Sequence, residues 1–196
     1  ARSGGEANAI AVRISKAASN KDKVAICGYH GWHDWYLATN LDDKENLSKH
    51  LLPGLEPAGV PSSLKGSTIA FEYNNYEQLE NIVKNNNIGT IKMEVIRNHD
   101  PKNDFLKKVR KLATKNNIIL IFDECSSGFR QTFGGIHKYF GVNPDIALEN
   151  KEIKYLREAT LAKDKVLYPG HPVAAIAADN PHIAEEAISL IKVVIS

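Results

Sequence analysis

The chain has 196 residues, 43% of them hydrophobic and 24% charged, which is typical of a globular protein with one core, or with one domain and part of another. A formal net charge of +2 is too small to indicate binding to nucleic acid or to a membrane surface. The two cysteines, Cys27 and Cys125, lie far apart and indicate neither a zinc site nor a disulfide framework. No apolar run has the length of a membrane span, so we expect a cytoplasmic protein.

The first predicted element is a helix that follows a turn of small residues. Apolar side chains recur with a helical period from Ala7 to Ala18, and Ser3, Gly4 and Gly5 precede them. Two interpretations fit this turn. Free amides at a helix N-terminus bind anions, and glycine allows a phosphate to approach the backbone closely. Alternatively, Ser3 is an ordinary N-cap followed by flexible glycines.

Strands and helices then alternate along the chain. We expect strands at residues 24–27, 69–71, 88–96 and 118–122, and helices near residues 76–83 and 105–113. Residues 40–66 are polar and rich in proline and glycine, which predicts a long irregular connection. The alternation predicts an α/β fold with a doubly wound parallel sheet.

The apolar strand at residues 118–122 is followed directly by two carboxylates, Asp123 and Glu124. Parallel sheets bind ligands at the carboxyl ends of their strands, so Asp123 is a candidate ligand for a metal ion, a ribose hydroxyl or a protonated ring nitrogen. The alternative is that Asp123 only caps the next turn. A nucleoside-triphosphatase would need a G-x-x-x-x-G-K-[ST] loop, and the sequence contains none.

An aromatic segment, Gly28-Tyr29-His30-Gly31-Trp32-His33-Asp34, follows the predicted strand at residues 24–27. His30, His33 and Asp34 are weak candidates for metal ligands because no further ligand is clustered with them, and we expect no metal site. A tyrosine at a strand end, such as Tyr29, can instead stack on a flat heterocycle.

Several segments together resemble a known family. They are R-S-G-G-E-A-N-A at residues 2–9, the segment 28–34, the pair Met93-Glu94, F-D-E-C-S-S-G-F-R at residues 122–130, and Phe133-Gly134-Gly135. In this order and spacing they resemble the class III aminotransferases of the pyridoxal-phosphate fold type I, most nearly the glutamate-1-semialdehyde aminomutase branch, over residues 1–148. The resemblance implies a partial fold type I large domain, a homodimer, and transfer or migration of an amino group on a small amino acid such as glutamate 1-semialdehyde.

The resemblance also implies roles for single residues around pyridoxal 5′-phosphate. By this reading Ser3, Gly4 and Gly5 hold the phosphate. The ring would then contact Tyr29 on one face with His30 beside it, Asp123 at its protonated nitrogen, and Cys125, in place of the usual valine, on the other face. Glu94 would lie on the substrate side, although Val95 stands where the family commonly has proline.

The lysine that binds the cofactor covalently in this family is difficult to assign. Pro144-Asp145 is followed by an apolar strand, and Lys151 has the expected spacing. However, residues 149–155 lack the family's glycines and read as a charged helix, whereas a reactive lysine needs burial or cationic neighbours. We therefore interpret Lys151 as a coincidental match and expect impaired or absent catalysis.

The last part of the chain resembles a different family. Residues 156–196 are similar to the hammerhead domain of molybdenum hydroxylases, the xanthine dehydrogenase and aldehyde oxidase family. They predict a small β-β-α-β unit with strands at 166–168, 173–178 and 192–195 and a helix beginning at Asn180-Pro181.

The sequence therefore predicts two joined pieces, residues 1–148 and 156–196, with a junction at residues 149–155. Three functional hypotheses follow: a pyridoxal-phosphate enzyme, a non-catalytic remnant that binds cofactor without turnover, and a fragment of an oxidoreductase.

Overall fold

A computed structural model describes residues 1–48, 55–96, 98–149, 185, 187–190 and 192. The chain divides into two units, Ala1–Asn150 and Lys151–Ser196, and the fold reported below is that of the first. Lys151 lies outside the described residues, and so do the strands predicted at 166–168 and 173–178. Of the strand predicted at 192–195 only Lys192 is described, and it is in neither helix nor strand. Residues 187–189 are helical, within the helix predicted after Asn180-Pro181.

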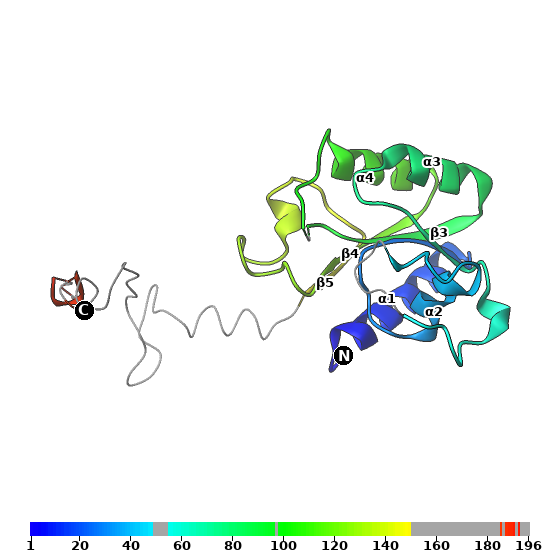
Figure 1. Ribbon diagram of the computed structural model, residues 1–196. Helices are drawn as coiled ribbons and strands as arrows, with labels where there is room; N and C mark the ends of the chain where they lie inside the picture. Colours follow the sequence, from blue (N-terminus) through cyan, green and yellow to red (C-terminus); the bar gives the residue numbers. More distant parts are fainter. Residues whose placement is uncertain (49–54, 97, 150–184, 186, 191, 193–196) are drawn as a thin grey trace. The chain divides into compact units, whose positions relative to one another are not determined.

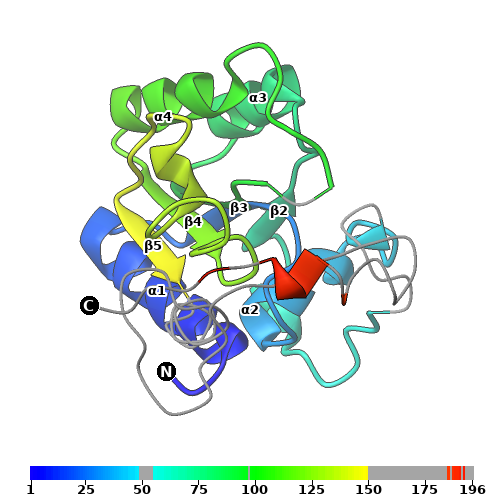
Figure 2. The same ribbon diagram turned by 90° about the vertical axis from the view of Figure 1, so that its left-hand side faces the viewer.

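The first unit is built on five parallel strands in the order β2-β1-β3-β4-β5. The strands are β1 (Lys23–Cys27), β2 (Thr68–Ala70), β3 (Ile88–Glu94), β4 (Ile119–Glu124) and β5 (Ile146–Glu149). In Figure 2, β2, β3, β4 and β5 lie in one layer between two layers of helices. The predicted doubly wound parallel sheet is confirmed.

Helices cover both faces of this sheet, as Figure 1 shows. The longer helices are α1 (Gly4–Ser19), α3 (Tyr76–Asn85) and α4 (Phe105–Lys115), and α2 (Asp34–Leu37) is a single turn. Helices α3 and α4 pack on one face, while α1 and α2 pack on the other. None of the described helices is long and apolar enough to cross a membrane.

Alternation along the strands separates two apolar cores. In β1, Ala25 and Cys27 belong to the core under α3 and α4, whereas Val24 and Ile26 belong to the core under α1 and α2. Successive side chains of a strand point to opposite faces, so a strand between two helical layers is apolar throughout. This is why the apolar runs of the sequence predicted the strands so well.

The structure corrects several details of the predicted elements. The connection at residues 40–66 contains a short 3-10 helix (Ser62–Leu64), and a second one (Ala38–Leu41) runs into its start. Strand β3 ends at Glu94 rather than at residue 96, and β4 extends through Glu124 rather than ending at residue 122. Asp123 and Glu124 are thus the last residues of a buried strand. Their carboxylates can be buried there because His30 bonds Asp123 and His137 bonds Glu124.

Candidate functional site

The N-terminus of α1 lies against the carboxyl ends of β1 and β4. A Cβ atom placed on Gly4 would lie 3.4 Å from Cys125 Sγ, and one on Gly5 would lie 3.4 Å from the ring of His33. The small-residue turn, the aromatic segment and the end of β4 are thus in contact at one edge of the sheet. The family resemblance implies that Gly5 and Asp123 contact one cofactor, and the structure has both residues at this edge.

Gly31 is a point of close approach between the aromatic segment and α1. Its φ of +99° lies in the region that favours glycine, and a Cβ atom there would be 3.1 Å from Gly5 Cα. A larger residue at this position would therefore push the segment away from the helix. Two glycines, one from each segment, allow the two backbones to meet.

The first turn of α1 is capped by its own side chains. Ser3 is the N-cap, and its Oγ accepts a hydrogen bond from Glu6 N at 3.2 Å. The backbone N–H of Arg2 donates in turn to the Glu6 carboxylate. The first amides of a helix have no acceptor within it, and the helix dipole places partial positive charge there. The structure thus confirms Ser3 as an N-cap, and the anion site at this turn stays a prediction.

Asp123 is held by three groups from different parts of the chain. Its Oδ2 accepts from His30 Nδ1 at 2.8 Å, and its Oδ1 accepts from Cys125 N at 3.2 Å. The third group is the ammonium of Lys92, whose Nζ lies 3.7 Å from Oδ2. Burial alone would raise the pKa of Asp123, but Lys92 and His30 outweigh burial and hold this pKa below its ordinary value. Asp123 is therefore an anion at neutral pH.

His30 is fully buried between two oxygen atoms. Its Nδ1 faces Asp123, and its Nε2 lies 3.1 Å from Cys27 O. Burial and the nearby Lys92 ammonium lower the pKa of His30 to about 4, against the pull of Asp123 in the other direction. The ring is therefore neutral at neutral pH. A neutral ring can donate to only one of the two oxygens, and donation to the Asp123 carboxylate is the stronger bond because it is charge-assisted.

The backbone around Tyr29 is fixed by polar contacts. Tyr29 N donates to Glu94 Oε2 at 3.1 Å, and Tyr36 Oη donates to Gly28 O at 2.9 Å. The Tyr29 ring meets the Tyr36 ring edge to face, with centroids 6.0 Å apart. A Cβ atom on Gly28 would lie 2.5 Å from Glu94 Oε2, so this turn needs glycine. Glu94 thus positions the segment that carries Tyr29.

Cys125 is half-buried beside Gly4 and Asp123. Burial and the Asp123 charge raise the pKa of its thiol to about 12, so the thiol is neutral. It is an uncharged packing group and not a nucleophile.

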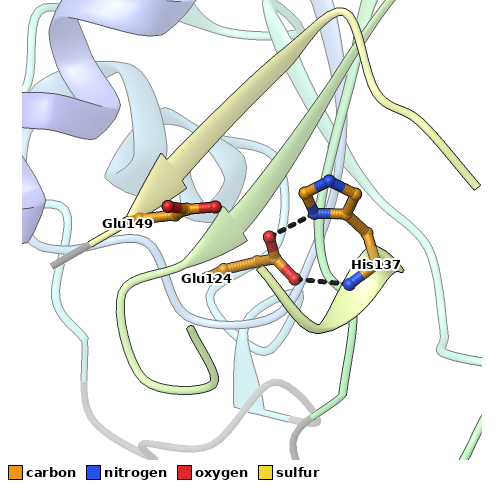
Figure 3. Close-up of side chains that lie close together, drawn as sticks. All are labelled: Glu124, His137 and Glu149. Atoms are coloured by element: carbon orange, nitrogen blue, oxygen red, sulfur yellow. Dashed lines mark hydrogen bonds and ion pairs between the residues drawn. The ribbon is translucent and has the colours of Figure 1, made fainter. Parts of the chain in front are cut away.

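A second polar cluster lies on the other side of β4. Figure 3 shows Glu124, His137 and Glu149, whose donor atoms lie within 4.8 Å of one another. Both oxygens of Glu124 are already engaged, one by His137 N at 2.9 Å and one by His137 Nδ1 at 2.6 Å. These bonds fix the chain after β4 to the sheet. A Cβ atom on Gly135 would collide with Glu124, so the close approach of this segment needs glycine there. The cluster is best explained as a structural anchor of the segment that contains Phe133-Gly134-Gly135.

Lys92 is the site residue that sequence reasoning missed. It lies in the middle of a buried strand between Ile91 and Met93, and it is fully buried. A single lysine between apolar residues of a predicted buried strand is the signal that could have identified it. The structure thus brings together Gly4, His30, Asp123, Cys125 and Lys92. Gly5 lies against the aromatic segment that carries Tyr29, and Ser3 begins the same helix as Gly5.

Sequence comparisons identify the family. The profile of the class III aminotransferases matches residues 1–173. Glutamate-1-semialdehyde 2,1-aminomutase from Methanobrevibacter smithii is 36% identical over 157 residues, which cover 76% of this chain and 36% of that protein. 3-Aminobutyryl-CoA aminotransferase from Cloacimonas acidaminovorans is 31% identical, covering 85% of this chain and 38% of that protein. The chain thus spans little more than a third of these relatives.

Solved structures share the fold. A transaminase with PLP bound has a TM-score of 0.66 at 21% identity, covering 91% of this chain and 44% of that one. A glutamate-1-semialdehyde aminomutase from Pseudomonas aeruginosa has a TM-score of 0.58 at 23% identity, covering 76% of this chain and 33% of that one.

The comparisons give no support to the hammerhead resemblance of residues 156–196. The aminotransferase profile continues to residue 173, past the expected start of the hammerhead. An aminomutase from Nitrosopumilus maritimus aligns with 97% of this chain at 32% identity, over 47% of its own length. Because the profile matches residues 1–173 of 196, the chain belongs to the class III aminotransferase family.

Proposed function

We propose that the first unit holds pyridoxal 5′-phosphate at the carboxyl edge of the sheet, for amino-group transfer or migration on a small amino acid such as glutamate 1-semialdehyde. One observation carries this proposal: the N-terminus of α1, the aromatic segment and the buried Asp123 anion meet at this edge. Relatives with aminomutase and aminotransferase activity support it.

The residues present fit the phosphate. Gly4 and Gly5 supply backbone amides without side chains that would block an anion, and the dipole of the 16-residue helix favours negative charge there. A Cβ atom at either glycine would fill the space toward Cys125 or His33.

The residues present also fit the ring. Asp123 is a buried carboxylate that would pair with a protonated ring nitrogen, and His30 orients it. We assign Tyr29 and Cys125 to the two faces of the ring. When bound, the cofactor supplies an electron sink that stabilises a substrate carbanion.

We further propose that turnover by this chain is weak or absent. Family chemistry needs a reactive lysine, and Lys151 is flanked closely by charged residues. Transaminase activity should therefore be at background and unchanged by Lys151→Ala. Clear activity that Lys151→Ala abolishes would contradict this and assign Lys151 as the catalytic residue.

The homodimer and the cytoplasmic location stay predictions.

Equilibrium titration with pyridoxal 5′-phosphate, followed by absorbance, tests the cofactor site. The chain should bind saturably, and Gly5→Asp should weaken binding by more than about tenfold because it adds a negative charge beside the phosphate. Gly59→Asp is the matched control, since a Cβ atom on Gly59 meets nothing within 4 Å. Equal affinity for both variants would overturn the proposed site.

A further inference from the structure

Lys92 occupies a row of the sheet that is otherwise apolar. On the α1 face its neighbours across the strands are Ile26 of β1 and Ile121 of β4, and the row continues to Ala70 and Ile146. Ile26 and Ile121 belong to the core under α1 and α2. Packing alone therefore favours an aliphatic residue at this position, and a buried ammonium there is costly.

The Lys92 ammonium is left without a hydrogen bond in the described part of the chain. Its side chain is fully buried, and its charge lies 3.7 Å from Asp123 Oδ2, beyond hydrogen-bonding distance. The side chain is thus aimed at the carboxylate that ends the neighbouring strand. An unsatisfied buried donor that points toward a site calls for an explanation.

The charged and titratable groups around Lys92 are few. The pKa of Lys92 is lowered, because burial outweighs Asp123, Cys125 and Glu94, which act in the other direction. His30 faces the same carboxylate from the segment after β1. Helix α1, which packs on this face, contributes the buried neutral residues Asn8 and Ser15, and Asn8 Oδ1 is also without a hydrogen bond. Asp123 is therefore the main counter-charge of Lys92.

We propose that Lys92 is a positioning residue that neutralises Asp123 when the ring nitrogen is absent and competes with that nitrogen for the carboxylate. This inference rests on the proposed function. One carboxylate cannot compensate two adjacent cations in a buried site. Binding of a protonated ring nitrogen beside Asp123 therefore favours the neutral form of Lys92, so cofactor binding is coupled to the protonation of Lys92.

The test uses pyridoxine 5′-phosphate, which carries the ring nitrogen and the phosphate but no aldehyde, so it forms no covalent bond with a lysine. Affinity and proton exchange are measured by calorimetry in two buffers of different ionisation enthalpy. Lys92→Met keeps an unbranched apolar side chain between Ile26 and Ile121. Lys111→Met is the matched control, because Lys111 is exposed on α4, which covers the other face of the sheet.

Lys92→Met should bind the probe at pH 7.5 about tenfold more tightly than the wild type, because the competing cation is gone. The wild type should release about one proton more per bound probe than Lys92→Met. Lys111→Met should behave as the wild type. Equal affinity and equal proton exchange in all three proteins would overturn the competition but leave the proposed cofactor site standing. If none of the three proteins binds the probe, the proposed function is overturned, and the competition with it.

A second measurement uses the wild type alone and does not depend on a variant that folds. NMR signals of lysine ε-methylene groups report the protonation of Nζ. Adding pyridoxine 5′-phosphate at pH 7.5 should shift the Lys92 signal toward that of the neutral amine. A Lys92 signal that keeps its position at saturating probe would overturn the inference.

Discussion

At the scale of residues, the site is organised around one buried carboxylate. Asp123 accepts hydrogen bonds from His30 and from Cys125 N, and it is the counter-charge of Lys92. These partners come from three separate segments, so Asp123 joins β3, β4 and the aromatic segment. A change at this residue should therefore affect both stability and ligand binding.

Asp123→Asn should destabilise the protein by about 3 kcal/mol or more, because it leaves the Lys92 ammonium buried without a counter-charge. Urea unfolding followed by circular dichroism measures this change. The matched control is Asp104→Asn on the surface, where the pair with Lys107 is exposed and its loss should have little effect. Equal stability of Asp123→Asn and the wild type would show that Lys92 is not charged in the folded protein.

His30 should make the protein less stable in mild acid. Its pKa is about 4 in the folded protein and near the ordinary value of 6.5 in the unfolded chain, so the unfolded chain binds more protons between these values. The contribution of neutral His30 to the free energy of unfolding is fully present above pH 6.5 and is lost as the pH falls to about 4. The loss amounts to about 3 kcal/mol.

Urea unfolding at a series of pH values measures this contribution. His30→Gln, which keeps a donor for Asp123, should have a flatter pH profile in the same range. An equal slope for both proteins would contradict the assignment to His30.

At the scale of elements, the sequence predicted the strands well and the site partners less well. Apolar runs such as 24–27 identify strands that are buried on both faces, whatever their neighbours are. The prediction ended β4 before Asp123 because carboxylates normally leave a core, and it did not foresee that His30 and His137 would satisfy Asp123 and Glu124. Lys92 was missed because its counter-charge is distant in sequence.

The contact between α1 and the aromatic segment depends on Gly31. Gly31→Ala should weaken pyridoxal 5′-phosphate binding and destabilise the protein by about 1–3 kcal/mol, because the new methyl group strains the backbone and presses on Gly5. Gly59→Ala is the control, since it has a similar positive φ but open space around it. If both variants lose stability equally and neither loses affinity, the close approach of the two segments has no role in binding.

At the scale of the whole molecule, the chain divides after Asn150. The family profile crosses this division and ends at residue 173. Sequence alone placed a change of family near residue 156 because residues 156–196 are similar to a hammerhead domain. The comparisons favour a continuous aminotransferase segment across the division.

Limited proteolysis tests whether the division separates two units. We predict that trypsin cuts first between Glu149 and Lys165, where Lys151, Lys154 and Arg157 are targets, and that a fragment close to residues 1–150 persists. Fragment masses measured over time identify the first cut. Equal resistance of this segment and of the sheet would mean that both units form one domain.

The central claim is that the edge formed by α1, the aromatic segment and Asp123 binds a phosphorylated pyridine. The most direct measurement is an NMR titration of the labelled protein with pyridoxal 5′-phosphate, and with pyridoxal as the control without phosphate. We predict that the phosphorylated ligand shifts the amides of Gly4 and Gly5 and the ring of His30, and that pyridoxal leaves the two glycine amides nearly unchanged. Shifts confined to other parts of the described chain, with these three residues unaffected, would contradict the account.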